Sequence, residues 1–214
     1  MNSHDWKRRY RVSKQKAAAE GAPGWYGRGY LPHFDRDHLT QFITFRLVDS
    51  LPAQVLESWQ AELKQLPDDE AMIERFRRVE RYLDSGYGAC WLRDERIAEM
   101  VQNALWYFHE KRYLLHAWCI MPNHVHVLIT PQAAWSLAKI VHSWKSYTAH
   151  EANKMLERQG DFWMHEPFDR YIRDETHFRR VVHYVENNPV KAGLCEKPED
   201  WKWSSAYWRK EQGK

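Results

Sequence analysis

The chain has 214 residues, enough for one domain with a substantial core. It contains no run of about 18 apolar residues and no apolar leader segment, so we expect neither a membrane span nor a secretion signal. The cysteines Cys90, Cys119 and Cys195 form no Cys-x-x-Cys pair, which argues against a zinc knuckle and a disulfide framework. The expected location is the cytoplasm, close to the nucleoid.

The net charge of +3 does not by itself indicate a nucleic-acid partner, but its distribution does. Six Lys or Arg residues and no acid fall between Lys7 and Lys16, and Arg8 and Arg9 in this run are candidate DNA contacts. The chain also has 12 tryptophans. Cations and aromatic faces together suit single-stranded phosphates and bases, although any one tryptophan is more simply explained as a core residue.

The first half of the chain reads as an arm, a strand and three helices. Residues 1–36 are basic and then rich in glycine, which predicts an arm and loop. Residues 41–48 are β-branched and aromatic and predict a strand. Start signals and helical spacing of apolar residues predict helices at 53–65, 69–83 and 94–110.

The second half predicts a hairpin followed by two helices. Apolar runs at 113–120 and 125–130 flank a Met-Pro-Asn turn. Further predictions are a helix at 135–158, a loop at 159–170, a fourth strand between 163 and 172, and a helix at 175–187 that stops before Pro189. This order outlines an α+β fold, an antiparallel sheet with helices on one face, of ferredoxin-like type. The domain would span 37–195, followed by an aromatic and basic tail at 196–214.

His124 and His126 are separated by one residue at the start of a predicted strand. Side chains alternate along a strand, so both imidazoles point to one face. Neutral imidazoles about 7 Å apart along a strand can converge on one divalent ion. An isolated His-x-His is more often two unrelated polar positions, and the pattern alone leaves both interpretations open.

Tyr147 and Glu151 lie four residues apart in the helix after the hairpin, so they share one helical face. A phenol with a pKa near 10 must lose its proton to a base, or attack a phosphorus that a metal has made more electrophilic. Tyr147 could then be a nucleophile and Glu151 a ligand. The alternative is an amphipathic helix in which Tyr147 packs and Glu151 is solvated.

Three segments resemble the IS200-like family of single-tyrosine HUH transposases, and within it the branch of REP-associated tyrosine transposases. MPNHVHVLI at 121–129 is similar to the family's HUH hallmark, and WKSYTAHEAN at 144–153 is similar to its tyrosine helix. YVENNPVKAGL at 184–194, followed by WSSA at 203–206, resembles its C-terminal signature. The resemblance extends over roughly residues 41–207.

The resemblance implies an endonuclease and strand-transferase that binds REP-like hairpins of single-stranded DNA and cuts near their foot. A 5′-phosphotyrosine forms and a free 3′-OH leaves. By this resemblance Tyr147 is the nucleophile, and His124 and His126 hold Mg²⁺ or Mn²⁺. Glu151 is our choice for the third ligand, with His150 and Asn153 as reserves. Two imidazoles and a carboxylate suit Mn²⁺, Zn²⁺ or Fe²⁺ somewhat better than Mg²⁺, but availability favours Mn²⁺ or Mg²⁺ in the cell.

The segment Tyr26-Gly27-Arg28-Gly29-Tyr30 resembles the Gly-Arg-Ser motif of that branch, with Gly29 in place of the serine. Gly27, Arg28 and Tyr30 are therefore candidate DNA contacts, and a flexible surface loop is the alternative. Lys145 on the tyrosine helix is a further DNA-binding candidate. We assign Asn187-Asn188-Pro189 a structural role at a helix end. A monomer is expected, with a dimer left open.

Three functions remain to be distinguished at this point. The first is an active DNA nickase and strand-transferase. The second is a non-catalytic binder of structured single-stranded DNA that derives from a transposase. The third is an unrelated metal hydrolase that uses activated water, which would be indifferent to Tyr147→Phe.

Overall fold

The structure is a computed structural model that describes residues 25–27, 32–34 and 39–213. Two short strands, β1 (Trp25–Gly27) and β2 (Pro32–Phe34), pair with each other in antiparallel fashion. Most of the predicted arm at 1–36 lies outside the described residues, and so do Arg8, Arg9, Arg28 and Tyr30.

The core of the fold is a four-stranded antiparallel sheet in the order β4-β5-β3-β6. Its strands are β3 (Gln41–Arg46), β4 (Tyr113–Ile120), β5 (His124–Pro131) and β6 (Phe168–Tyr171). The backbone N–H of Met121 donates to the carbonyl of His124 at 2.8 Å, which closes the predicted hairpin. The predicted strand, the hairpin and the fourth strand between 163 and 172 are confirmed.

Two helices cover one face of this sheet. They are α4 (Glu95–Tyr107), capped by the Asp94 side chain, and α5 (Leu137–Met155), capped by the Ser136 side chain. Their apolar faces form one core cluster with the strand residues that point toward them. The cluster includes Ile43, Val125, Val127, Ile97, Val101, Val141 and Trp144.

The prediction that helices cover only one face is wrong, because α6 (Glu175–Lys191) packs on the other. Phe42 and Leu128 alternate with the residues of the first cluster and join a second cluster with Val185 of α6. The sheet is therefore buried on both sides. The α+β class and the antiparallel sheet are confirmed.

α6 does not end before Pro189 as predicted. Pro189 is buried inside the last turn, where a missing N–H removes only one backbone hydrogen bond. The N–H of Ala192 still donates to the carbonyl of Asn188 at 2.9 Å, and that of Leu194 to Pro189 at 2.9 Å. Asn188 therefore remains on the helix, one turn after Tyr184.

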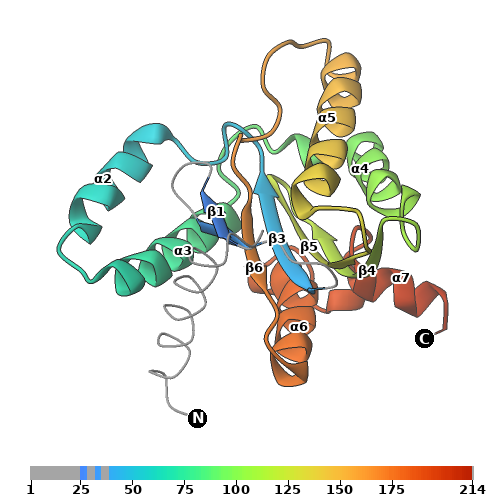
Figure 1. The fold of residues 1–214 in the computed structure, drawn as a ribbon. Helices are drawn as coiled ribbons and strands as arrows, with labels where there is room; N and C mark the ends of the chain where they lie inside the picture. Colours follow the sequence, from blue (N-terminus) through green and yellow to red (C-terminus); the bar gives the residue numbers. More distant parts are fainter. Residues whose placement is uncertain (1–24, 28–31, 35–38, 214) are drawn as a thin grey trace.

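The helices α2 (Ala53–Leu63) and α3 (Asp68–Asp84) extend to one side of the sheet as a helical lobe (Figure 1). α3 reaches the sheet through Phe76, whose ring stacks on Phe168 of β6 with centroids 4.3 Å apart. The short 3-10 helix Trp91–Arg93 then leads into α4.

The end of the chain is part of the same fold. After a 3-10 turn at Pro198–Asp200, the N–H of Ile120 in β4 donates to the carbonyl of Trp203 at 2.9 Å. α7 (Ser205–Glu211) then contacts α6, since Ser205 donates to Glu186 Oε1 at 2.5 Å and Arg209 pairs with the same oxygen. Among the described helices, none combines the length and the apolar character that a bilayer crossing would require.

Candidate metal and nucleophile site

His124 and His126 lie side by side on β5, and both side chains are fully buried. Their Nε2 atoms are 3.0 Å apart. They point to the face that α6 covers, because the His126 ring stacks on Phe42 with centroids 5.5 Å apart. The structure thus brings the two imidazoles together as the alternation along the strand predicts.

Asn123 fixes the tautomer of His124. Its Nδ2 donates to the carbonyl of Tyr87 at 2.9 Å, so its Oδ1 is the atom that faces His124 Nδ1 at 2.7 Å. An amide oxygen only accepts, so Nδ1 of His124 carries the proton. The Nε2 atom of His124 therefore presents a lone pair to the space beside His126.

Thr44 hydrogen-bonds the Nδ1 atom of His126, as Asn123 does that of His124. Its hydroxyl lies 2.8 Å from His126 Nδ1, on the neighbouring strand β3. A hydroxyl can accept as well as donate, so Nε2 of His126 is also able to offer a lone pair. Burial lowers the pKa of His124 to about 3 and holds that of His126 well below its ordinary value. Both rings are neutral at physiological pH, as metal ligation requires.

A carboxylate from the helical lobe meets this pair. Oε2 of Glu80, on α3, lies 3.7 Å from Nε2 of His126. The side chain is 5% exposed, and Oε2 has no hydrogen-bond partner within the described part of the chain. Burial, followed by the charge of Asp84, raises the pKa of Glu80 to about 8, and Lys191 opposes the shift. A buried carboxyl oxygen without a partner is costly, which marks this position as unusual.

α6 contributes two more polar groups without partners. The Tyr184 ring stands edge-on to His126 with centroids 5.5 Å apart, and its hydroxyl is buried without a hydrogen bond to any described residue. Asn188 follows four residues later on the same helical face. Its Oδ1 and Nδ2 are likewise buried without partners in the described residues.

These groups are of the chemical types that bind a divalent cation. Two neutral imidazoles, a carboxylate and an amide oxygen are ligands that Mn²⁺ accepts, and several of them now lack partners. In the described residues no three His, Cys, Asp or Glu side chains already surround an ion position. The two histidine Nε2 atoms already lie close enough together to share one ion, whereas a third protein ligand would have to move toward them.

The structure does not bring Tyr147 or Glu151 to the histidine pair. Both lie on α5, whose buried residues pack against the opposite face of the sheet. The Tyr147 side chain is 54% exposed, and Oε1 of Glu151 lies 3.8 Å from Nε2 of His150. Asn153 donates to the carbonyl of Gly160 at 2.8 Å. The predicted shared face of Tyr147 and Glu151 exists, but it is turned away from the histidines.

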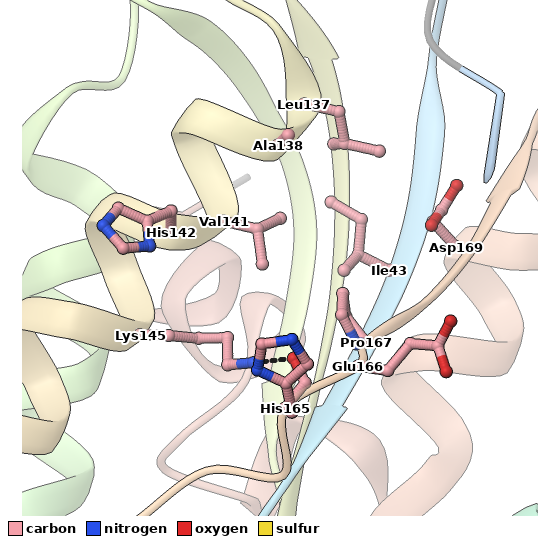
Figure 2. Close-up of a pocket in the computed structure, with 10 residues that line it drawn as sticks. All are labelled: Ile43, Leu137, Ala138, Val141, His142, Lys145, His165, Glu166, Pro167 and Asp169. Carbon is pink, nitrogen blue, oxygen red and sulfur yellow. Dashed lines mark hydrogen bonds between the residues drawn. The ribbon is translucent and has the colours of Figure 1, made fainter. Parts of the chain in front are cut away.

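Lys145, on the same helix α5, forms hydrogen bonds with the segment before β6. Its ammonium donates to the carbonyls of Met164 at 2.7 Å and His165 at 2.6 Å. Figure 2 shows it reaching from α5 across a small pocket to the segment before β6, with Ile43 and Val141 in the wall. In this structure Lys145 connects α5 to the segment before β6 through these two carbonyls, and its predicted contact with DNA stays a prediction. Of the glycine-rich motif at 26–30, the described residues include only Tyr26 and Gly27, in β1.

Comparison with known families identifies the segment that carries the site. Residues 89–188 match the family described as "Transposase IS200 like". This segment of the chain is therefore similar to IS200-like transposases. The matched segment includes the histidine pair, Tyr147 of α5 and Tyr184 of α6. Glu80 and the helical lobe precede it.

Two relatives resemble part of the chain. A REP-associated tyrosine transposase of Escherichia coli is 27% identical over 97 residues, 45% of this chain and 56% of the relative. A Haemophilus influenzae protein assigned provisionally to the same group is 28% identical over 97 residues, 41% of this chain and 55% of the relative. The match thus spans about half the length of these relatives.

A solved structure extends the likeness to the fold. A REP-associated tyrosine transposase bound to a REP hairpin superposes with a TM-score of 0.53 at 18% identity. The match covers 88% of this chain and 86% of that one. The overall fold is therefore shared, and at this identity the likeness concerns the fold alone.

Sequence reasoning missed Glu80, Tyr184 and Asn188. Tyr184 and Asn188 carried a usable signal, since they show the same four-residue spacing as Tyr147 and Glu151 within a segment that resembles the family. Placing a helix end before Pro189 hid that spacing. Glu80 carried no local signal, because it meets His126 only through the docking of α3.

Proposed function

We propose that this transposase nicks and rejoins single-stranded DNA near REP-like hairpins, with Tyr184 as the nucleophile in place of Tyr147. The observation that supports this most directly is the position of Tyr184. Its ring contacts His126, and its buried hydroxyl has no partner among the described residues. Membership of residues 89–188 in the transposase family supports DNA as the substrate class.

His124 and His126 would hold a divalent cation, Mn²⁺ or Mg²⁺, through their Nε2 atoms. When bound, such a cation polarises the scissile phosphate and makes its phosphorus more electrophilic. Asn123 and Thr44 keep the two rings oriented through hydrogen bonds of 2.7 and 2.8 Å. The buried setting keeps both imidazoles neutral and therefore available as ligands.

The reaction of the chain's own residues is a transesterification. The Tyr184 oxygen forms a bond to phosphorus, the bond from phosphorus to the 3′ oxygen breaks, and the phenolic proton ends on that oxygen. The products are a 5′-phosphotyrosine and a free 3′-OH. Because the number of phosphodiester bonds is unchanged, the reverse step rejoins strands without an external energy source.

A cavity of about 290 Å³ offers an approach to this site. Thr44 and Glu80, which both contact His126, line it together with Arg46 and Arg75. Burial and the nearby charge of Arg75 lower the pKa of Arg46 to about 10, so Arg46 remains cationic at neutral pH. Two guanidinium groups in this lining can pair with phosphates, and the carboxyl groups of Glu57, Glu80 and Glu166 lie in the same wall. The base contacts predicted for Gly27, Arg28 and Tyr30, and the phosphate contacts of Arg8 and Arg9, belong to the same proposal.

The test is a covalent-capture assay with matched tyrosine variants. The full chain is incubated with single-stranded REP-like hairpin oligonucleotides and Mn²⁺, and the products are separated on denaturing gels. We expect a protein–DNA adduct with the wild type and with Tyr147→Phe, and none with Tyr184→Phe. Mass spectrometry of the adduct identifies the modified peptide.

The other outcomes point to different functions. Loss of the adduct in Tyr147→Phe with retention in Tyr184→Phe would return the nucleophile to α5. Hairpin binding without cleavage under Mn²⁺, Mg²⁺ and Zn²⁺ would support a non-catalytic DNA binder. Cleavage that survives both substitutions would indicate hydrolysis by activated water.

A further inference from the structure

We infer that Glu80 is the carboxylate ligand of the metal centre, supplied by the helical lobe of α2 and α3. This inference rests on the proposed function only in placing a divalent cation at His124 and His126. It assigns a ligand that precedes the matched transposase segment 89–188. The cation would thereby connect α3 to β5.

The distances suit this assignment. Donors about 2.1 Å from one ion lie about 3.0 Å apart at a right angle and about 3.4 Å apart at a tetrahedral angle. The two Nε2 atoms are 3.0 Å apart, and Oε2 of Glu80 is 3.7 Å from Nε2 of His126. Relative to His126, the carboxylate oxygen would have to move by about 0.3–0.7 Å to reach this range. The described residues hold no preformed group of three such ligands, so the side chain of Glu80 would rotate toward the histidine pair when a cation binds.

The charged groups around Glu80 leave its Oε2 atom available for a metal ion. Lys191, the cation that acts on it, is paired with Asp84 at 2.5 Å, whereas no hydrogen bond reaches Oε2 within the described residues. Oε2 of Glu80 lies 3.7 Å from Nε2 of His126, which is too far for a direct hydrogen bond between the two groups. A cation between the carboxylate and the imidazoles would satisfy all three groups.

The other carboxylate considered for this role is excluded by its location. Glu151 lies on α5, on the opposite face of the sheet. Asn188 of α6 is compatible with Glu80, because its amide oxygen would approach the same site from the helix that carries Tyr184. The ligands would then come from α3, β5 and α6, three separate parts of the chain.

Metal affinity measured without DNA tests the inference independently of catalysis. Mn²⁺ is titrated into the full chain by calorimetry and by the loss of its free-ion EPR signal. We expect Glu80→Gln to weaken Mn²⁺ binding by tenfold or more, and the matched control Glu151→Gln to stay within about twofold of wild type. Thermal melting in EDTA establishes that each variant is folded.

A thiolate at the same position gives a positive readout. We expect Glu80→Cys to shift the preference from Mn²⁺ toward Cd²⁺, because a thiolate is a softer ligand than a carboxylate. Unchanged Mn²⁺ affinity in Glu80→Gln, together with loss in His126→Ala, would overturn the Glu80 assignment and leave the histidine metal centre in place. Mn²⁺ binding that depends on Glu80 but occurs without any DNA adduct would support the assignment and count against the nickase.

Discussion

The side-chain amide of Asn123 determines which nitrogen of His124 carries a proton. It can do so because its own orientation is set by the carbonyl of Tyr87, 2.9 Å from its Nδ2. The carbonyl of Tyr87, in the loop before α4, thus acts through Asn123 on the His124 nitrogen that is proposed to bind a cation. Substitutions around the histidine pair should therefore act on metal binding even where they touch no metal.

Asn123→Ala should weaken Mn²⁺ binding by about 10- to 100-fold, because His124 loses the partner that fixes its tautomer. The change also leaves the Tyr87 carbonyl without its partner, so the free energy of unfolding should fall by about 1–3 kcal/mol. Calorimetric titration and urea unfolding measure the two effects. The control is Asn103→Ala at an exposed position of α4, for which both quantities should remain at the wild-type value.

Thr44→Val should also reduce Mn²⁺ affinity, because it replaces the hydroxyl beside Nδ1 of His126 with a methyl group of similar size. Thr44→Ser keeps the hydroxyl and should bind Mn²⁺ nearly as the wild type does. Equal affinities for the Val and Ser variants would show that this hydrogen bond has no influence on the metal site.

Tyr113→Phe should destabilise the fold by about 1–3 kcal/mol, because it leaves buried polar groups unpaired. The Tyr113 hydroxyl donates to the carbonyl of Leu105 at 2.8 Å and accepts from Nε1 of Trp144 at 2.8 Å. Urea unfolding followed by tryptophan fluorescence measures the loss. Tyr107→Phe is the matched control, since that side chain is 72% exposed and its change should stay within about 0.5 kcal/mol.

Lys145 should make stability depend on pH under alkaline conditions. Burial lowers its pKa from 10.5 to about 8 in the folded chain, despite its two carbonyl partners. Between these values the unfolded chain binds more protons, so the free energy of unfolding contributed by this group rises with pH from about 8 toward 10.5. Below pH 8 the lysine is charged in both states and its cost is fully present.

Chemical denaturation at pH 7.5, 8.5 and 9.5 measures this slope. Lys145→Met should flatten it, whereas Lys139→Met, at an exposed position of the same helix, should keep it. A slope that is identical in the wild type and in Lys145→Met would assign the pH dependence to other groups.

Local patterns in the sequence were sufficient for most of the elements and for the histidine pair. Alternation along 124–129 places His124 and His126 opposite Val125 and Val127, and the two core clusters confirm this division. Helical spacing identified which residues share a face of α5, but it contains no information about the side of the sheet on which that helix docks. Tyr147 with Glu151 and Tyr184 with Asn188 satisfy the same spacing, and only the packing distinguishes them.

Two other features needed the three-dimensional structure for different reasons. Pro189 is a reliable signal against a helix interior, yet in a last turn its cost is one hydrogen bond, and burial outweighs it. Glu80 lies in an amphipathic helix among many charged residues. Its contact with His126 joins segments that are more than 40 positions apart in the sequence, so no local pattern could predict it.

Glu186 also affects the orientation of α6, the helix that carries the proposed nucleophile. Lying two positions after Tyr184, it accepts from Ser205 and pairs with Arg209, so the final helix acts as a brace on the back of α6. The rotation of α6 about its own axis decides where the phenol points. Residues 205–209 therefore help to set the orientation of the helix that carries the proposed nucleophile Tyr184, and we expect removal of α7 to disturb that orientation.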